Sequence, residues 1–164
     1  MIKNIIFDMG NVMLKFDRNY FLDAVGVKPA DRRTLMNNVY LSLEWAKMDR
    51  GSMTEEKAAA SMCSRLPERL HEQAHLLVDR WDRPILPVPG MAELVRELKE
   101  AGYGVYLLSN ASYRQHEYWP RVPGSEYFDG TLISADVKLV KPCAEIYELL
   151  YSTFDLTPSE CLFI

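Results

Sequence analysis

The chain has 164 residues and a formal net charge of −4 at neutral pH, a length that suits one domain or a core with a smaller insertion. Because acidic residues outnumber basic ones, the composition shows no excess of positive charge, which argues against nucleic acid or an anionic lipid surface as a partner. No apolar stretch approaches the roughly 20 residues of a membrane span. Three widely spaced cysteines favour reduced thiols in a cytoplasmic protein.

The first half of the chain predicts one strand followed by helices. Residues 2–7 are apolar and end at Asp8 and Gly10, which is typical of a buried strand that runs into a turn. Residues 18–83 have helical spacing. One helix face is predicted from Leu35, Val39, Leu43 and Ala46, and a capping box from Ser52 to Glu55.

After the proline-rich segment 83–90 the pattern alternates between helices and strands. The expected elements are a helix over 91–101, strands over 104–109 and 130–134, a helix over 142–151 and a strand over 161–164. This order predicts an α/β fold, a Rossmann-like doubly wound parallel sheet with an inserted α-helical cap. We expect the core to comprise residues 1–16 and 85–164, and the cap residues 17–84.

The last predicted strand, "CLFI", is wholly apolar, as a central strand would be. An uncovered apolar edge strand is an aggregation hazard. The sequence therefore predicts that the core is incomplete at Ile164 and that the natural chain continues.

Polar residues follow the predicted strands at the points where parallel sheets bind ligands. Asp8 follows the first strand, Ser109 and Asn110 end the second, and Lys141 precedes a later helix. A carboxylate can attack phosphorus, while a hydroxyl, an amide and an ammonium group can hold phosphate oxygens. Together they indicate covalent phosphoryl or acyl chemistry.

The same segments resemble the motifs of the haloacid dehalogenase superfamily. "IIFDMGNVML" is similar to motif I, "VYLLSN" to motif II and "VKLVKPCAEIY" to motif III, while "EWAKMDRGSMTEE" resembles an inserted helical cap. Within the superfamily the chain resembles the α-D-glucose-1-phosphate phosphatase type, which shares the "FDxGNV" opening and a Trp-Pro pair after motif II, here Trp119-Pro120.

The resemblance implies Mg²⁺-dependent hydrolysis of a small phosphomonoester, with a sugar phosphate favoured, through an aspartyl-phosphate intermediate. It implies that Asp8 is the nucleophile and that Ser109, Asn110 and Lys141 bind phosphate, Lys141 also being catalytic. Mg²⁺ would be held by Asp8 and the backbone carbonyl of Gly10. We expect Trp45, Asp49 and Arg50 in the cap to set substrate selectivity, and a small phosphorylated metabolite to be the partner.

Two departures from the family pattern matter for this prediction. Phosphatases of the family carry a general acid two residues after the nucleophile, where this chain has Gly10. Asp17 is a candidate replacement, although Asp at such a position is more often a helix cap. The acids of motif IV, which complete the magnesium site in the family, would follow Ile164.

Three alternatives stay open on the sequence. A 2-haloacid dehalogenase of the same superfamily also uses an Asp nucleophile, lacks the second acid and needs no magnesium. A catalytically inactive fragment would fit the absent motif IV. "HEQAH", from His71 to His75, matches a helical zinc-peptidase signature, with Glu72 as base, but no third ligand is marked.

Overall fold

The computed structural model describes all 164 residues, and its centre is a four-stranded parallel sheet in the order β3-β2-β1-β4. The strands are β1 (Asn4–Phe7), β2 (Gly104–Ser109), β3 (Gly130–Ile133) and β4 (Cys161–Phe163). The chain passes from β1 to β2 and β3 on one side and then returns to place β4 on the other side of β1. The predicted α/β, Rossmann-like fold is confirmed.

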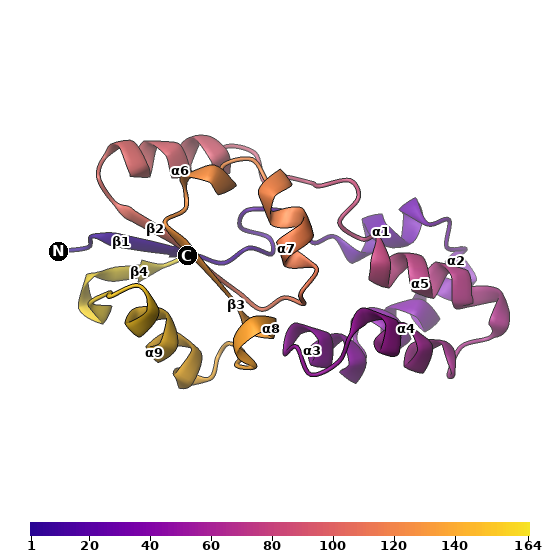
Figure 1. Ribbon diagram of the computed structural model, residues 1–164. Helices are drawn as coiled ribbons and strands as arrows, with labels where there is room; N and C mark the ends of the chain where they lie inside the picture. The colour runs from indigo at the N-terminus through magenta and orange to yellow at the C-terminus, as the bar shows by residue number, and fades with distance from the viewer.

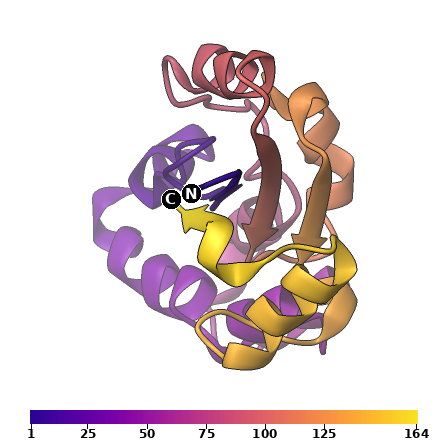
Figure 2. The same cartoon turned by 90° about the vertical axis from the view of Figure 1, so that its left-hand side faces the viewer.

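Helices cover both faces of this sheet because successive strand residues point in opposite directions. Ile5 and Phe7 belong to one apolar cluster, together with Val95 of helix α6 (Met91–Glu100). Ile6 belongs to another cluster with Ile146 of helix α9 (Ala144–Thr153). Figures 1 and 2 show the sheet between α6 and α9. The neighbouring strands β1 and β2 are therefore mostly buried on both faces, whereas the wholly apolar β4 lies at the sheet edge with Leu162 and Phe163 exposed.

Between β1 and α6 the chain forms a group of helices with its own apolar interior. They are α1 (Arg18–Ala24), α2 (Pro29–Leu35), a π-helical turn (Met36–Tyr40), α3 (Leu43–Asp49), α4 (Glu55–Cys63) and α5 (His71–Asp79). Sixteen buried apolar residues, all between Phe21 and Val78, pack together here. This helical unit lies to one side of the sheet, beyond the ends of the strands (Figure 1). No helix combines the length and apolar character that crossing a bilayer requires.

Two local predictions in the helical unit are wrong. Leu35 and Val39 are buried, but Leu43 is 72% exposed, because Ser42 starts a new helix by accepting a hydrogen bond from the Trp45 N–H. The predicted single helix face over 35–46 therefore does not exist. The next helix is capped by Thr54, whose hydroxyl accepts from the Lys57 N–H, rather than by Ser52.

Glu44 ties helix α3 to helix α4, through Ser61, and to Arg65 just beyond the end of α4. Glu44, which is buried, accepts bonds of 2.7 and 2.9 Å from the Arg65 guanidinium and one of 2.8 Å from the Ser61 hydroxyl. The Arg65 hydrogen bonds outweigh burial and lower the pKa of Glu44 to about 2. This pair orients the helix that carries Trp45 and Asp49.

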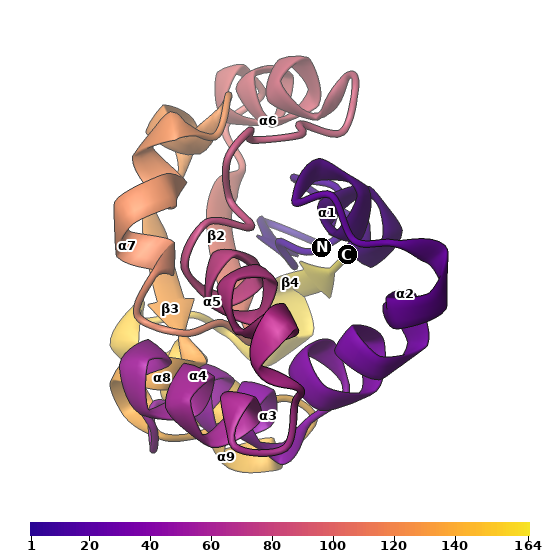
Figure 3. The same ribbon diagram turned by 90° about the vertical axis from the view of Figure 1, so that its right-hand side faces the viewer.

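The C-terminal end of α3 lies directly against the segment that follows β3, where helix α8 (Ser134–Val137) begins (Figure 3). The Ser134 hydroxyl donates to the carbonyl of Asp49, and Lys138 Nζ donates to the carbonyl of Gly51 at 2.5 Å. Gly51 has a φ of +68°, and a Cβ there would lie 2.1 Å from the carbonyl oxygen of Ala135. The close approach of the two units therefore requires glycine at this position.

Replacing Gly51 by Ala is expected to destabilise the fold more than the same change at Gly26. Both glycines have a φ of +68°, but an added Cβ at Gly26 meets nothing within 4 Å. Both variants incur the left-handed backbone cost of roughly 1–2 kcal/mol, and Gly51→Ala adds an overlap of roughly 1–3 kcal/mol. Denaturant unfolding of the two variants measures the difference. Equal losses would show that the two units do not touch at Gly51.

Candidate active site

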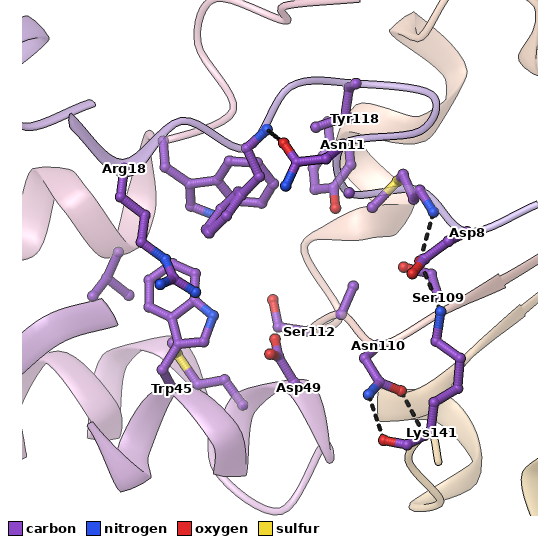
Figure 4. A pocket seen from close by; sticks show the side chains of 18 of the residues that line it. Asp8, Asn11, Arg18, Trp45, Asp49, Ser109, Asn110, Ser112, Tyr118 and Lys141 are labelled. Atoms are coloured by element: carbon purple, nitrogen blue, oxygen red, sulfur yellow. Dashed lines mark hydrogen bonds and ion pairs between the residues drawn. The ribbon is translucent and has the colours of Figure 1, made fainter. Parts of the chain in front are cut away.

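A cavity of about 270 Å³ lies beyond the carboxyl ends of β1 and β2, between the sheet and helix α3 (Figure 4). This is where open parallel sheets bind ligands. The cavity wall at the sheet is polar, while the wall at the helical unit includes apolar and aromatic side chains. Its lining includes Asp8, Gly10, Phe16, Arg18, Trp45, Met48, Asp49, Glu55, Trp81, Ser109, Asn110, Ser112, Tyr118 and Lys141.

Asp8 stands at the sheet wall because β1 ends one residue before it. Its Oδ1 accepts a hydrogen bond of 2.7 Å from the backbone N–H of Met9. The same oxygen forms an ion pair with Lys141 Nζ, 2.7 Å away. The Asp8 side chain is 38% exposed. Since both contacts fall on Oδ1, Oδ2 is left for a ligand in the cavity.

Lys141 is held rigidly against Asp8. Its Nζ also donates to the carbonyl of Leu108 at 2.8 Å, and its side chain is only 12% exposed. Asn110 fixes the lysine backbone from both ends of its amide, donating to the Lys141 carbonyl at 2.9 Å and accepting from the Lys141 N–H at 2.8 Å. The Asn110 side chain is therefore engaged with Lys141, and its contribution is to position that residue.

Other donors at this wall come from Ser109 and the backbone. Ser109 is buried at the end of β2 and lies beside Asp8 in Figure 4. The backbone N–H groups of Gly10 and Asn110 make no hydrogen bond within the chain. Converging donors of this kind suit the oxygens of a phosphate group.

The oxygen donors that suit a divalent cation here are the Asp8 carboxylate and the Gly10 carbonyl. Gly10 is exposed and its carbonyl accepts no hydrogen bond within the chain. The chain holds no cluster of three or more His, Cys, Asp or Glu side chains of the kind that binds a metal. A cation that keeps most of its waters, as Mg²⁺ does, fits this donor set.

The residues predicted to set selectivity divide into two groups. Trp45 and Asp49 project from α3 into the cavity (Figure 4). Arg50 does not line the cavity, and its Nε donates to the carbonyl of Lys138 at 3.3 Å. Arg50 therefore belongs to the contact between the two units.

Asp49 has an unusual charge state for an aspartate. Its pKa is raised to about 7, mainly by burial. The positive charge of Arg18 lowers the pKa, and the carboxylate of Glu55 contributes to raising it. Glu55 is itself bound by the Ser112 hydroxyl at 2.6 Å. A large fraction of Asp49 is therefore protonated near neutral pH.

Sequence patterns missed three residues of this region. Ser134 is fully buried and joins the loop after β2 to Asp49, donating to the Asp49 carbonyl and accepting from the Ala111 N–H at 2.9 Å. Tyr118 and Arg18 line the cavity. Ser134 ends the predicted strand over 130–134 and Tyr118 precedes the Trp119-Pro120 pair, but neither pattern shows what these side chains contact, and Arg18 lies in no motif.

The predicted zinc signature lies on helix α5, away from the cavity lining. The ring of His71 contacts the carbonyl of Leu66 at 3.1 Å, and His75 is exposed. No third protein ligand stands near these two histidines. The helix therefore presents two histidines without the set that a zinc peptidase needs.

Comparisons with curated proteins point to phosphatases. The chain is 28% identical to a sesquiterpene phosphatase of Aspergillus oryzae over 99% of this chain and 79% of that protein. It is 27% identical to the D-ribitol-5-phosphate phosphatase of Bacteroides thetaiotaomicron over 100% of this chain and 82% of that protein.

Solved structures show the same fold. A haloacid dehalogenase family enzyme of B. thetaiotaomicron, crystallised with magnesium and inorganic phosphate, superposes with a TM-score of 0.73 at 20% identity, covering 99% of this chain and 84% of that one. The L-2-haloacid dehalogenase of Xanthobacter autotrophicus superposes with a TM-score of 0.67 at 20% identity, covering 99% and 69%. The family model for haloacid dehalogenase-like hydrolases matches residues 2–164. The chain therefore belongs to the haloacid dehalogenase-like hydrolase family, which confirms the predicted enzyme class.

Proposed function

We propose that the protein is a phosphatase that hydrolyses a small phosphomonoester through a covalent phosphate on Asp8. One observation carries this proposal: the Asp8 carboxylate lies 2.7 Å from Lys141 Nζ at the polar end of a ligand-sized cavity. The two curated phosphatases support it, because they align with nearly the whole chain.

The arrangement assigns a separate task to each residue. Oδ2 of Asp8 attacks phosphorus, because Oδ1 is held by Met9 and Lys141. Lys141 offsets the negative charge that gathers as nucleophile and phosphate approach. The Ser109 hydroxyl and the free N–H groups of Gly10 and Asn110 hold the phosphate oxygens. Asn110 keeps Lys141 in place through the two bonds to its backbone.

We propose that Mg²⁺ is the cofactor and that Asp8 and the Gly10 carbonyl hold it. The related B. thetaiotaomicron enzyme crystallised with magnesium and phosphate supports this choice. A bound magnesium ion would neutralise phosphate charge at the reacting centre.

We further propose that residues 17–84 act as a cap that sets substrate choice. Trp45 and Trp81 of the cap, together with the adjoining Phe16, line the cavity and can pack against the carbon skeleton of a leaving group. Asp49 and Arg18 offer polar contacts beside them. A sugar phosphate, as in the α-D-glucose-1-phosphate phosphatase type, fits this mixture, and the ribitol phosphate phosphatase relative supports it. The sesquiterpene phosphatase relative makes a prenyl phosphate the informative comparison substrate.

A substrate panel tests the proposed function. Phosphate release is measured for hexose phosphates, ribitol 5-phosphate, farnesyl phosphate and p-nitrophenyl phosphate, with Mg²⁺ and with a chelator. We expect magnesium-dependent phosphate release. Halide release from a 2-haloacid, unaffected by the chelator, would identify a dehalogenase instead, a rival favoured by the glycine at position 10. No release of either product would favour the inactive alternative.

Trp45→Ala is expected to change substrate preference more than basal chemistry. The Trp45 ring packs against the rings of Tyr40 and Phe16, with centroid distances of 4.9 and 5.9 Å. It also forms part of the cavity wall. Its loss removes contact with a bulky leaving group, so kcat/KM for such esters should fall about 10- to 100-fold. Acetyl phosphate, which has little to contact, should be affected much less.

The matched control for this prediction is Trp119→Ala. Trp119 packs on Phe128 at 5.0 Å and is absent from the cavity lining. Its replacement should leave the ratio between substrates unchanged. If Trp45→Ala lowers kcat/KM for all substrates by the same factor, the residue has only a structural role.

A further inference from the structure

The proposed chemistry needs an acid that gives a proton to the leaving group. The position at which phosphatases of this family carry that acid is a glycine here. Gly10 stands two residues after Asp8, and a Cβ built there would meet nothing within 4 Å. Asp17 cannot replace it, because its Oδ1 caps helix α1, accepting from the Asn19 and Tyr20 N–H groups at 2.9 and 3.1 Å. Asp17 is also absent from the cavity lining.

Asp49 is the carboxyl group that faces the same cavity from the opposite wall. It projects from the end of α3 into the space between Trp45 and the sheet wall (Figure 4). Its backbone is fixed to the core by the hydroxyl of Ser134. The carboxyl group makes no hydrogen bond and no ion pair within the chain, so its acid proton is available to a ligand.

The surroundings of Asp49 keep it a usable acid. The charged and titratable groups around it are Arg18, Glu55 and the phenol of Tyr118. Lys141, which also lines the cavity, is paired with Asp8. Burial with only partial compensation raises the pKa of Asp49 to about 7, near the optimum for a group that both gives and takes protons at neutral pH.

A second group indicates that a polar ligand atom belongs in this space. The hydroxyl of Tyr118 is directed into the cavity (Figure 4), although the residue is only 1% exposed. This hydroxyl has no hydrogen-bond partner in the chain. Buried polar atoms are rarely left unpaired, so a bound ligand or water is expected to supply the partner.

We propose that Asp49 is the general acid and base of the reaction, an inference that rests on the proposed phosphatase function. As Oδ2 of Asp8 bonds to phosphorus, the bond from phosphorus to the ester oxygen breaks and that oxygen takes the Asp49 proton. The product leaves as an alcohol. Water then attacks phosphorus and gives a proton to the Asp49 carboxylate, while the bond between phosphorus and Asp8 breaks. Phosphate is released and both carboxyl groups return to their starting states.

The test is the dependence of kcat/KM on leaving-group pKa in Asp49→Asn, a variant of nearly the same shape. We expect kcat/KM for alkyl phosphates to fall about 10²- to 10⁴-fold, the range that general acids supply. For 2,4-dinitrophenyl phosphate, whose leaving group needs no proton, the fall should be less than about tenfold. The variant Asp17→Asn, which preserves a helix cap, should keep the wild-type slope. An unchanged slope in Asp49→Asn would overturn the inference.

A rescue variant separates this inference from the proposed function. Adding Gly10→Asp to Asp49→Asn places an acid in open space beside the nucleophile and should restore part of the alkyl phosphate turnover. If the wild-type protein releases no phosphate from any ester, the proposed function fails. If the wild type does release phosphate, but Asp49→Asn, with or without Gly10→Asp, leaves the dependence of kcat/KM on leaving-group pKa unchanged, only the role of Asp49 fails.

A stability measurement tests the charge state of Asp49 without any substrate. The folded pKa of about 7 lies above the ordinary value of 3.8, so the folded state binds one more proton than the unfolded state between these pH values. Stability contributed by the neutral carboxyl is therefore lost as pH rises from about 4 to 7. The Tm of Asp49→Asn, minus that of the wild type, should rise across this window and then level off. A constant difference would contradict a protonated Asp49.

Discussion

Asp8→Asn is expected to lower phosphatase turnover more than about a thousandfold, because an amide cannot act as the nucleophile that forms an acyl phosphate. The fold should persist. An Asn side-chain oxygen can still accept from the Met9 N–H, and Lys141 retains its bond to the Leu108 carbonyl. Phosphate release and thermal unfolding are measured together, so that lost chemistry is distinguished from lost structure.

The matched control for Asp8→Asn is Asp23→Asn. Asp23 pairs with Arg32 on the exposed surface of the helical unit and does not line the cavity. Its replacement should leave turnover near the wild-type value. Residual activity above one part in about a hundred in a folded Asp8→Asn protein would assign the nucleophile to another group.

Lys141→Met is expected to lower kcat/KM about 10²- to 10³-fold, the effect of removing one preorganised charge from a reacting centre. Methionine approximates the length of the lysine stem, so the change removes mainly the ammonium group and its 2.7 Å contact with Asp8. Asn110 binds only the backbone of Lys141 and is retained. Kinetics on p-nitrophenyl phosphate give the measurement.

Lys99→Met provides the comparison for Lys141→Met. Lys99 lies on α6 and forms its ion pair with Asp129, 2.7 Å away, outside the cavity lining. We expect it to retain wild-type kinetics. If Lys141→Met stayed within about tenfold of the wild type, the charge beside Asp8 would have no part in phosphoryl transfer.

The sheet and its polar edge were predictable from sequence, because both depend on short-range pattern. The apolar runs that become β1 and β2 are each followed within a residue by a polar group, and parallel strands bring their carboxyl ends together. Asp8, Ser109 and Lys141 therefore line one cavity, as the predicted element order requires.

The helical unit was less predictable because tertiary contacts decide its details. Leu43 fits a continuous apolar face, yet Ser42 ends the preceding turn and leaves Leu43 exposed. The site partners missed by the motifs are contacts between distant segments. Ser134 reaches Asp49, 85 positions away, and Tyr118 reaches the cavity from a short helix. No local pattern encodes such pairings.

The most direct measurement of the central claim is to trap the covalent phosphate on Asp8. The enzyme is mixed with substrate, quenched in acid during turnover and reduced with borohydride, which converts an acyl phosphate to an alcohol and leaves free carboxylates unchanged. Mass spectrometry of the peptide containing "IIFDMGNVML" should then locate homoserine at position 8. Reduction at any other carboxyl group, or at none while phosphate is still released, would contradict a phosphatase that acts through Asp8.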